Sequence, residues 1–429
     1  MKSEFPTRAQ IEAEQLEQLR ALLTELFPAN PFYSKKLQAK GITFDVASLE
    51  DFSRRFPFTT KSEIVQDQLA NPPFGTNLTY PLANYTRYHQ TSGTTGKPLR
   101  WLDTPQSWEA MLGTWTEVLL AAGVHAPDHV YFAFSFGPFI GFWLAFESAA
   151  RLGCLCIPGG GLSSLARLHA ILENKVTVVC CTPTYALRLA QVAAEEKIDL
   201  RQSQVKTLIV AGEPGGSVAS VRARISDLWG GLRVFDHHGM TEVGPVTHEC
   251  PARPGVLHVV EPTFYAEVCQ PSTGAAVGPG ETGELVLTTL DRVGSPLLRY
   301  RTGDLVRRGA GDLCPCGRQT MTLEGGILGR GDDMVVVRGV NVFPAAVDEI
   351  IQSCGGVAEY QLQVDTRPAL PEMLLQIEPD SMTQDTAALV GKLQKEFEKA
   401  LALRVIIKTA RAGELPKSEL KASRWRIIR

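Results

Sequence analysis

Hydrophobic residues recur at helical spacing near the start of the chain. Between residues 7 and 27, most of the isoleucine and leucine residues have another three or four positions away, so that they share one face of a helix. This spacing predicts an amphipathic helix whose apolar face packs against the rest of the protein.

From about residue 100 to residue 240, short apolar runs alternate with longer helical patterns. The predicted strands are 176–183, 205–213 and 232–239, and the predicted helices between them are 163–175 and 184–196. Strands that alternate with helices are typical of a parallel sheet with helices on both faces. We therefore expect an α/β fold with doubly wound, mostly parallel sheet.

The pattern changes twice after this region. Residues 256–330 carry shorter apolar runs separated by Gly, Pro and Asp, which predicts a β-rich lobe. The last part has its own α+β pattern, with a helix from Pro344, strands at 372–379 and 404–410, and a helix at 386–403. About 95 residues suffice for a separate domain. We predict a large N-terminal domain, 1–331, and a small mobile C-terminal domain, 332–429.

One apolar stretch, residues 130–146, raises the question of a membrane span. It is uncharged, but it is shorter than the roughly 20 residues that a spanning helix needs. Pro138 also interrupts it, and two glycines stand within it. A buried strand, a loop and the start of a helix explain the stretch better, so we expect no membrane role.

Composition and charge agree with a soluble globular protein. The chain has 429 residues, of which 44% are hydrophobic and 21% charged, and its formal net charge is −3. This charge argues against a broad basic surface for nucleic acid. The first residues lack the apolar core of a secretory signal, so we expect a cytoplasmic protein. Nine cysteines, an odd count, make a disulfide framework improbable in that compartment.

The segment 92–97 concentrates hydroxyl groups, glycine and one lysine. Its six residues are Ser92, Gly93, Thr94, Thr95, Gly96 and Lys97. The glycine spacing differs from that of the Walker phosphate loop, and Pro98 follows the lysine. Glycines still allow backbone N–H groups to approach a phosphate closely, and Lys97 adds charge. Taken alone, the segment fits a phosphate loop and a plain turn equally well.

Six motifs together carry a family resemblance. They are "TSGTTGKP" (91–98), "AGEP" (211–214), "HHGMTE" (237–242), "YRTGDLV" (300–306), "GRGDDMVVVRG" (329–339) and "PKSELKASR" (416–424). In this order and spacing the chain resembles the adenylate-forming superfamily of acyl-CoA synthetases, adenylation domains and luciferases. "NPFYSKKL", "FPFTTKSEI" and "RGVNVFP" are similar to phenylacetate–CoA ligases, and the resemblance spans essentially the whole chain.

The resemblance implies an enzyme that uses ATP and Mg²⁺ to convert a carboxylic acid to an acyl-adenylate, and then transfers the acyl group to coenzyme A. It implies that residues 92–97 hold the β- and γ-phosphates, that Thr241 contacts the α-phosphate and that Glu242 binds Mg²⁺. Asp304 would accept hydrogen bonds from the ribose hydroxyls, although from the residues alone an aspartate after glycine is more often a turn cap. The other implied nucleotide contacts are Gly212, Glu213, Pro214, His238 and Arg330.

His238 stands where relatives commonly carry a tyrosine that stacks on adenine. Two lysines, Lys417 and Lys421, compete for the catalytic role near the end of the chain. The motif of phenylacetate ligases aligns Lys421 with the catalytic lysine, which would bridge the carboxylate and the α-phosphate. Asp332 takes the hinge position, and Gly339 would reach the tunnel for the thiol after the small domain rotates.

Four further residues suggest a metal that the motifs do not require. Some relatives hold structural zinc with the same set of residue types, here Cys250, His258, Cys314 and Cys316. Three thiolates and one imidazole suit a closed tetrahedral zinc site, whose role would be structural. His248 is an alternative ligand.

The acyl pocket of the family implies an aromatic or arylacetic acid for this chain. Phe134, Phe136, Phe139 and Gly239 are the expected lining, and the phenylalanines also fit a generic core. Transfer to a carrier-protein phosphopantetheine or to an amine remains an alternative to coenzyme A. A catalytically silent nucleotide-binding regulator is a remoter alternative, and a homodimer is open.

Overall fold

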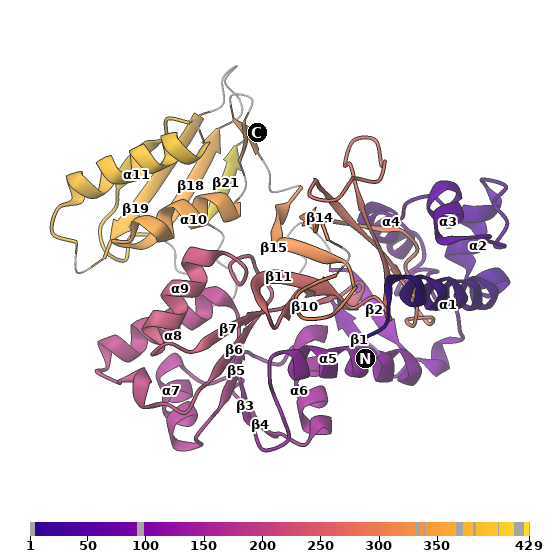
Figure 1. Cartoon of the computed structure of the whole chain (residues 1–429), viewed down its shortest axis with the longest axis horizontal. Coiled ribbons are helices and arrows are strands. Elements are labelled where there is room, and N and C mark those ends of the chain that lie inside the picture. Colours follow the sequence, from indigo (N-terminus) through magenta and orange to yellow (C-terminus); the bar gives the residue numbers. More distant parts are fainter. Residues whose placement is uncertain are drawn as a thin grey trace.

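The computed structural model describes residues 5–91, 98–311, 313–331, 335–337, 340–342, 344–365, 372–380, 383–401, 403–415 and 424–428. The chain forms a large unit and a smaller one that lies to one side of it (Figure 1).

A five-stranded parallel sheet forms the centre of the large unit, with the strand order β4-β3-β5-β6-β7. Its strands are β3 (His129–Phe132), β4 (Leu155–Pro158), β5 (Val178–Cys181), β6 (Thr207–Val210) and β7 (Arg233–Asp236). All four pairings are parallel. Strands β5 and β6 are buried throughout, as expected of strands covered on both faces. The predicted doubly wound sheet is confirmed.

Helices cover both faces of this sheet (Figure 1). One face packs against α5 (Pro105–Ala121) and α6 (Ile140–Leu152), and the other against α7 (Ser164–Glu173), α8 (Pro183–Glu195) and α9 (Ala219–Leu228). The segment predicted as a strand up to residue 183 ends sooner, because Thr182 caps α8 by accepting a hydrogen bond from the Tyr185 amide.

The β-rich lobe is a six-stranded antiparallel sheet with the order β10-β11-β15-β14-β13-β12. Its strands are β10 (Thr247–Cys250), β11 (Arg253–Val259), β12 (Phe264–Cys269), β13 (Thr282–Thr289), β14 (Tyr300–Arg308) and β15 (Thr322–Arg330). Four helices lie beside the lobe: α1 (Arg8–Ala29), α2 (Pro31–Gln38), α3 (Leu49–Arg55) and α4 (Lys61–Ala70). Helix α1 confirms the first sequence prediction, and Thr7 and Gln10 close its start in a capping box.

Two short hairpins connect these layers. Strands β1 (Arg87–Gln90) and β2 (Arg100–Asp103) are antiparallel and flank the hydroxyl-glycine segment. Strands β8 (Gly239–Met240) and β9 (Gly244–Pro245) form the second hairpin directly after β7.

The small unit has its own hydrophobic core, built from residues between Val335 and Ile427. Its elements are β16 (Val335–Val337), β17 (Val340–Val342), α10 (Pro344–Cys354), β18 (Val357–Asp365), β19 (Glu372–Pro379), α11 (Thr386–Leu401), β20 (Ile406–Thr409) and β21 (Trp425–Ile428). Helix α10 lies beside α9 of the large unit (Figure 1), where Arg224 donates a hydrogen bond to Gln352. The predicted domain boundary at 331/332 adjoins residues outside the described ranges and stays a prediction.

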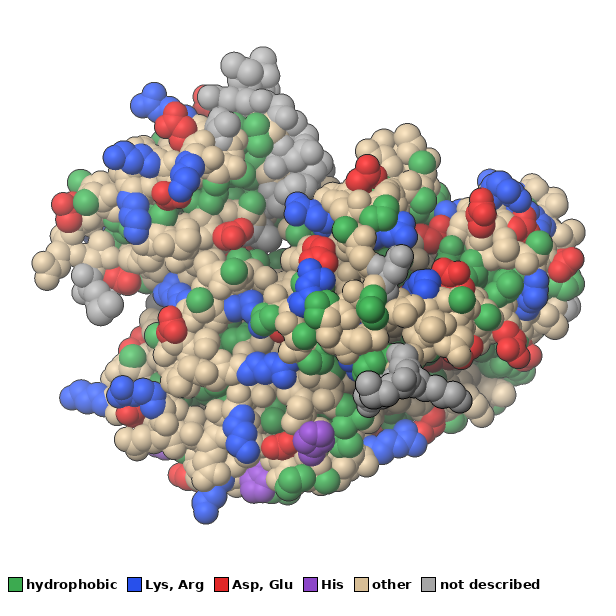
Figure 2. All heavy atoms as spheres, viewed as in Figure 1, with side chains coloured by type: hydrophobic (Ala, Val, Ile, Leu, Met, Phe, Trp, Pro, Cys, Tyr) green, Lys and Arg blue, Asp and Glu red, His purple; other side chains and the backbone are tan. Residues whose placement is uncertain are grey.

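The stretch 130–146 forms the end of β3, a loop and the first half of α6. Within the described part of the chain, no helix is long and apolar enough to cross a membrane. On the face drawn in Figure 2, basic and acidic side chains are interspersed, in keeping with the small net charge.

Candidate active site

The candidate residues gather where parallel strands end. In open α/β sheets, ligands bind beyond the carboxyl ends of the strands, at the point where the strand order reverses. Here β3 is followed along the chain by β4 on one side and β5 on the other, so the reversal lies between β3 and β5. The "AGEP" motif follows β6, "HHGMTE" follows β7 and the aromatic segment follows β3. These motifs therefore share one edge of the sheet.

Several predicted site residues lie outside the described residues. They are Ser92, Gly93, Thr94, Thr95, Gly96, Lys97, Asp332, Gly339 and Lys421. The flanks of residues 92–97 are described: the Thr91 amide donates to the Leu99 carbonyl oxygen at 3.0 Å, which continues the pairing of β1 with β2.

His238 and Asp304 bring two motifs together across 66 residues of sequence. The Nε2 atom of His238 lies 3.0 Å from Oδ2 of Asp304, and the Asp304 side chain is only 6% exposed. Arg330, the cross-strand partner of Asp304 in the pairing of β14 with β15, places Nη1 3.7 Å from Oδ1 of the same carboxylate. The three predicted nucleotide contacts are therefore neighbours.

Gly303 makes this arrangement possible. Its φ of +79° lies in the left-handed region, and a Cβ atom there would stand 3.1 Å from Nη2 of Arg330. A side chain at residue 303 would therefore strain the backbone and push against the guanidinium.

Glu242 is buried and already faces a cation. The whole residue is 4% exposed, and its Oε1 atom lies 3.2 Å from Nζ of Lys61, the first residue of α4. Burial raises the pKa of Tyr300, and the nearby Glu242 carboxylate acts in the same direction. Lys61 belongs to the "FPFTTKSEI" segment, but no role was expected for it, because only the tertiary fold brings it to Glu242.

Glu213 faces α8 in this conformation. Its Oε1 accepts hydrogen bonds from the Thr184 amide at 2.7 Å and from the Thr184 hydroxyl. Gly212 precedes it with a φ of +91°, which glycine adopts without strain. Pro214 lines a pocket that also includes Asp348 and Arg424 of the small unit. The expected contact of these residues with adenine stays a prediction.

The aromatic segment forms a connected cluster. Phe134 stacks on Phe142 at 4.0 Å between ring centroids, and Phe136 contacts Trp143 at 5.0 Å. Phe139 packs edge-on against Phe142 at 5.9 Å. Phe134, Phe136 and Phe139 are all only partly buried, and the first two border the core of α5 and α6 rather than fill it. Gly239 begins β8, and a Cβ there would lie 2.8 Å from the Gly244 carbonyl oxygen.

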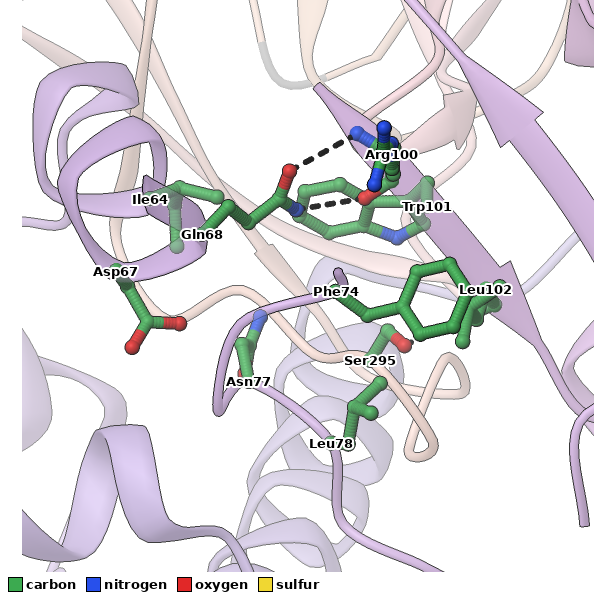
Figure 3. Close-up of a pocket in the computed structure, with 10 residues that line it drawn as sticks. All are labelled: Ile64, Asp67, Gln68, Phe74, Asn77, Leu78, Arg100, Trp101, Leu102 and Ser295. Carbon is green, nitrogen blue, oxygen red and sulfur yellow. Dashed lines mark hydrogen bonds between the residues drawn. The ribbon is translucent and has the colours of Figure 1, made fainter. Parts of the chain in front are cut away.

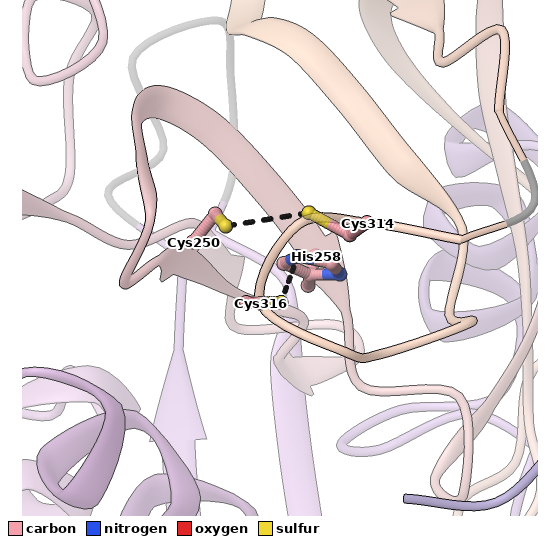
Figure 4. A group of neighbouring side chains, drawn as sticks. All are labelled: Cys250, His258, Cys314 and Cys316. Carbon is pink, nitrogen blue, oxygen red and sulfur yellow. Dashed lines mark hydrogen bonds between the residues drawn. The ribbon is translucent and has the colours of Figure 1, made fainter. Parts of the chain in front are cut away.

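Cys250, His258, Cys314 and Cys316 converge, as the sequence predicts. Their ligand atoms all lie within 4.8 Å of one another (Figure 4). The Sγ atoms of Cys250 and Cys314 are 3.5 Å apart, and Sγ of Cys316 is 3.4 Å from Nε2 of His258. A tetrahedral zinc with bonds of about 2.3 Å to sulfur and about 2.0 Å to nitrogen separates its ligands by roughly 3.5–3.8 Å. The four atoms therefore fit a zinc ion.

The protonation of His258 also suits a metal ligand. Burial lowers its pKa to about 3, so that the imidazole is neutral. Its Nδ1 atom lies 2.8 Å from the Thr320 hydroxyl, which orients the ring with Nε2 toward the cysteines. His248, the alternative ligand, directs Nδ1 to the Glu249 carbonyl oxygen at 3.0 Å and lies outside the group of four.

Comparison with known proteins decides the family. Residues 88–290 match the AMP-binding enzymes, and residues 339–427 match the AMP-binding enzyme C-terminal domain. A phenylacetate-coenzyme A ligase of Aromatoleum evansii is 34% identical over 388 residues, 87% of this chain and 83% of that ligase. The enzyme of the same name from Escherichia coli is 31% identical over 97% of this chain and 94% of its own. The chain belongs to the phenylacetate–CoA ligase family of AMP-binding enzymes. It is accordingly an AMP-forming acid–thiol ligase.

Solved structures agree with this assignment and distinguish conformations. The enzyme superposes on a 2-hydroxyisobutyryl-CoA ligase in the postadenylation state with a TM-score of 0.92 and 28% identity, over 99% of this chain and 90% of that one. The same ligase in the thioesterification state gives a TM-score of only 0.75, at 29% identity over 99% of this chain and 91% of that one. Because both structures are of the same ligase, the difference in TM-score reflects how the parts of that ligase are arranged in each state. The arrangement of the two units here resembles that of the postadenylation structure more than that of the thioesterification structure.

Proposed function

We propose that the enzyme activates an aryl or arylacetic acid with ATP and Mg²⁺, releases pyrophosphate, and transfers the acyl group from the adenylate to coenzyme A. The contact between His238 and Asp304 carries this proposal, because it brings together the 237–242 motif, which contains Glu242, and the 300–306 motif. A buried carboxylate that accepts hydrogen bonds suits a ribose diol, and a second carboxylate suits a hard cation.

In this proposal each motif holds one part of the reacting complex. Asp304 and Arg330 bind the ribose, while Gly212, Glu213, Pro214 and His238 surround adenine. Thr241 contacts the α-phosphate, Glu242 binds Mg²⁺, and residues 92–97 hold the outgoing phosphates. These groups offset the negative charge that builds up when a carboxylate attacks a triphosphate. Lys421 would bridge the two reacting anions.

The partly buried aromatic cluster supports the proposed class of acid. Rings at residues 134, 136 and 139 offer a flat apolar surface that suits an aromatic substrate. The curated relatives named above are phenylacetate ligases. Since the structural neighbour is named for a short branched hydroxy acid, 2-hydroxyisobutyrate belongs in the test as a competitor.

The test of the function is ATP–pyrophosphate exchange over a panel of phenylacetate, benzoate, other aryl acids and 2-hydroxyisobutyrate. The expected result is exchange that depends on an aryl acid, followed by thioester formation when coenzyme A is added. A loaded carrier protein and a simple amine are offered in parallel as acceptors. Transfer to one of them but not to coenzyme A would support the alternative, and absence of exchange with every acid would support the silent regulator.

Lys421 should be required for the first half-reaction. We expect Lys421→Ala to abolish ATP–pyrophosphate exchange, because Lys421 would be the group that bridges the attacking carboxylate and the α-phosphate. Lys417→Ala is the matched control, since it removes the same charge four residues earlier and should retain exchange. Normal exchange in Lys421→Ala would refute the assignment.

We also propose that the small domain, 332–429, rotates about Asp332 between the two half-reactions. In the second arrangement Gly339 would line the path of the thiol. The domain pose that resembles the postadenylation state is one end point of such a rotation. For the cysteine–histidine cluster we propose structural Zn²⁺, held by Cys250, His258, Cys314 and Cys316, since all four ligand positions are filled by protein.

A further inference from the structure

A fully buried ion pair joins the end of β2 to the connection after β13. Arg292 and Asp103 have side chains that are 1% and 0% exposed. Nε of Arg292 donates to Oδ1 of Asp103 at 2.6 Å, and Nη2 donates to Oδ2 at 2.8 Å. Burial alone would raise the pKa of Asp103, but Arg292 and His89 together outweigh this and lower it, so that the carboxylate is charged.

The same guanidinium reaches the motif that carries Glu242. Nη1 of Arg292 donates to the carbonyl oxygens of Thr241 at 2.9 Å and Glu242 at 2.8 Å. Asp103 is the last residue of β2, the strand that leaves the hydroxyl-glycine segment. Arg292 therefore joins the strand after one phosphate motif to the backbone of the other.

Helix α4 closes this set of contacts into a ring. At its start, Lys61 pairs with Glu242. Toward its end, the side-chain amide of Gln68 bonds to the backbone of Arg100: Nε2 donates to the Arg100 carbonyl oxygen at 2.7 Å, and Oε1 accepts from the Arg100 backbone N–H at 3.0 Å (Figure 3). Arg100 begins β2 and Asp103 ends it. The contacts thus run from α4 through β2 and Arg292 to Glu242, and back to α4.

Stability alone is a weak reason for such a pair. Taking two charges out of water costs about as much as their attraction returns, and apolar replacements of buried pairs are often neutral or stabilising. What arginine adds is geometry, because its planar fork can bind a carboxylate in two places and still donate to other acceptors. Here the additional acceptors are the two carbonyls of the Thr241–Glu242 segment.

We propose that Asp103 and Arg292 are positioning residues that fix the backbone of Thr241 and Glu242 relative to β2, and so set how Mg²⁺ and ATP are held. This inference rests on the proposed function. It assigns no contact between either residue and the substrate. Loss of the pair should weaken the binding of Mg²⁺-ATP, because the supporting partners of a metal ligand typically contribute 10–100-fold in affinity.

The experiment measures the dissociation constant of Mg²⁺-ATP by calorimetric titration, the Mg²⁺ concentration that gives half-maximal binding, and the melting temperature. The variants are Asp103→Asn, which keeps the size of the side chain, and Arg292→Lys, which keeps its charge. Each removes the two-point bond between guanidinium and carboxylate. Glu267→Gln is the matched control, because Glu267 forms a second buried two-point pair with Arg299, at 2.9 and 3.0 Å, that touches neither Thr241 nor Glu242.

We expect all three variants to melt at lower temperature, and only Asp103→Asn and Arg292→Lys to bind Mg²⁺-ATP about tenfold or more weakly. In a Glu242→Gln background, Asp103→Asn should add little, because both changes act through the same group. The proposal would be overturned if the two variants kept wild-type affinity and Mg²⁺ dependence while their melting temperature fell as in Glu267→Gln. It would also be overturned if the losses of affinity from Glu242→Gln and Asp103→Asn were additive. Should Asp103→Asn not fold, Arg292→Lys decides. A wild-type protein that binds no Mg²⁺-ATP would refute the proposed function instead.

Discussion

At the scale of single residues, the candidate site depends on glycine at a position of positive φ and on side-chain pairs between residues that are distant in sequence. Motif spacing locates His238, Glu242 and Asp304 in advance, because each follows or lies within a recognisable strand. Sequence cannot locate Lys61 or Arg292 in the same way. Arg292 pairs with a carboxylate 189 residues away, and an isolated arginine between turn residues gives no local signal of burial.

Gly303 offers a residue-scale test of the proposed ribose site. Gly303→Ala should cost on the order of 1 kcal/mol of stability through the positive φ, and should also displace Arg330 and raise the KM for ATP. Gly280→Ala is the matched control, since Gly280 has a φ of +81° but nothing within 4 Å of its Cβ position. Unfolding measurements and steady-state kinetics on both variants check this. Equal KM values for ATP in the two variants would contradict a role of Arg330 in binding the ribose.

At the scale of elements, alternating apolar runs specify the parallel strands and the helices between them, whereas their ends are set by capping. Thr182 shows this, because its side chain binds the Tyr185 amide and so converts the end of a predicted strand into the start of α8. The antiparallel order of the β-rich lobe is less predictable. Its neighbours β11 and β15 are separated by more than 60 residues, and local pattern carries no information about such pairings.

The cysteine–histidine cluster is predicted to fasten β10 and β11 to the connection between β14 and β15. Removing one ligand should therefore release zinc and lower the melting temperature of the lobe, while ATP–pyrophosphate exchange persists at low temperature. Cys314→Ser tests this, with metal analysis expected to fall from about one zinc per chain to none. Cys269→Ser is the control, because Cys269 is also buried but lies outside the cluster. A wild-type protein that contains no zinc would contradict the assignment.

At the scale of the whole molecule, His237 links stability to pH. Burial lowers its pKa to about 3, and the nearby His238 and His248 act in the same direction. Its Nδ1 atom lies 2.6 Å from the Thr247 carbonyl oxygen, which requires the neutral ring to donate there. The unfolded chain, with a pKa of about 6.5, binds an extra proton between those values. Stability from this group is complete above about pH 6.5 and is lost as the pH falls toward 3.

Between pH 7 and pH 5 this group should account for about 2 kcal/mol of lost stability. Urea unfolding at both pH values should therefore show a smaller loss in His237→Asn than in the wild type. His125→Asn, at an exposed position, should lose as much as the wild type. An equal pH dependence in all three proteins would show that His237 is not held neutral by the fold.

The central claim is that motifs distant in sequence surround one acyl-adenylate. Its most direct test is a calorimetric titration with a stable arylacetyl-adenylate analogue in which a sulfamoyl group replaces the phosphate. We predict one binding site per chain, a loss of about tenfold or more in affinity for Asp304→Ala, and no loss for Asp45→Ala on the exposed surface. Absence of binding to the wild type, or unchanged affinity in Asp304→Ala, would contradict the account.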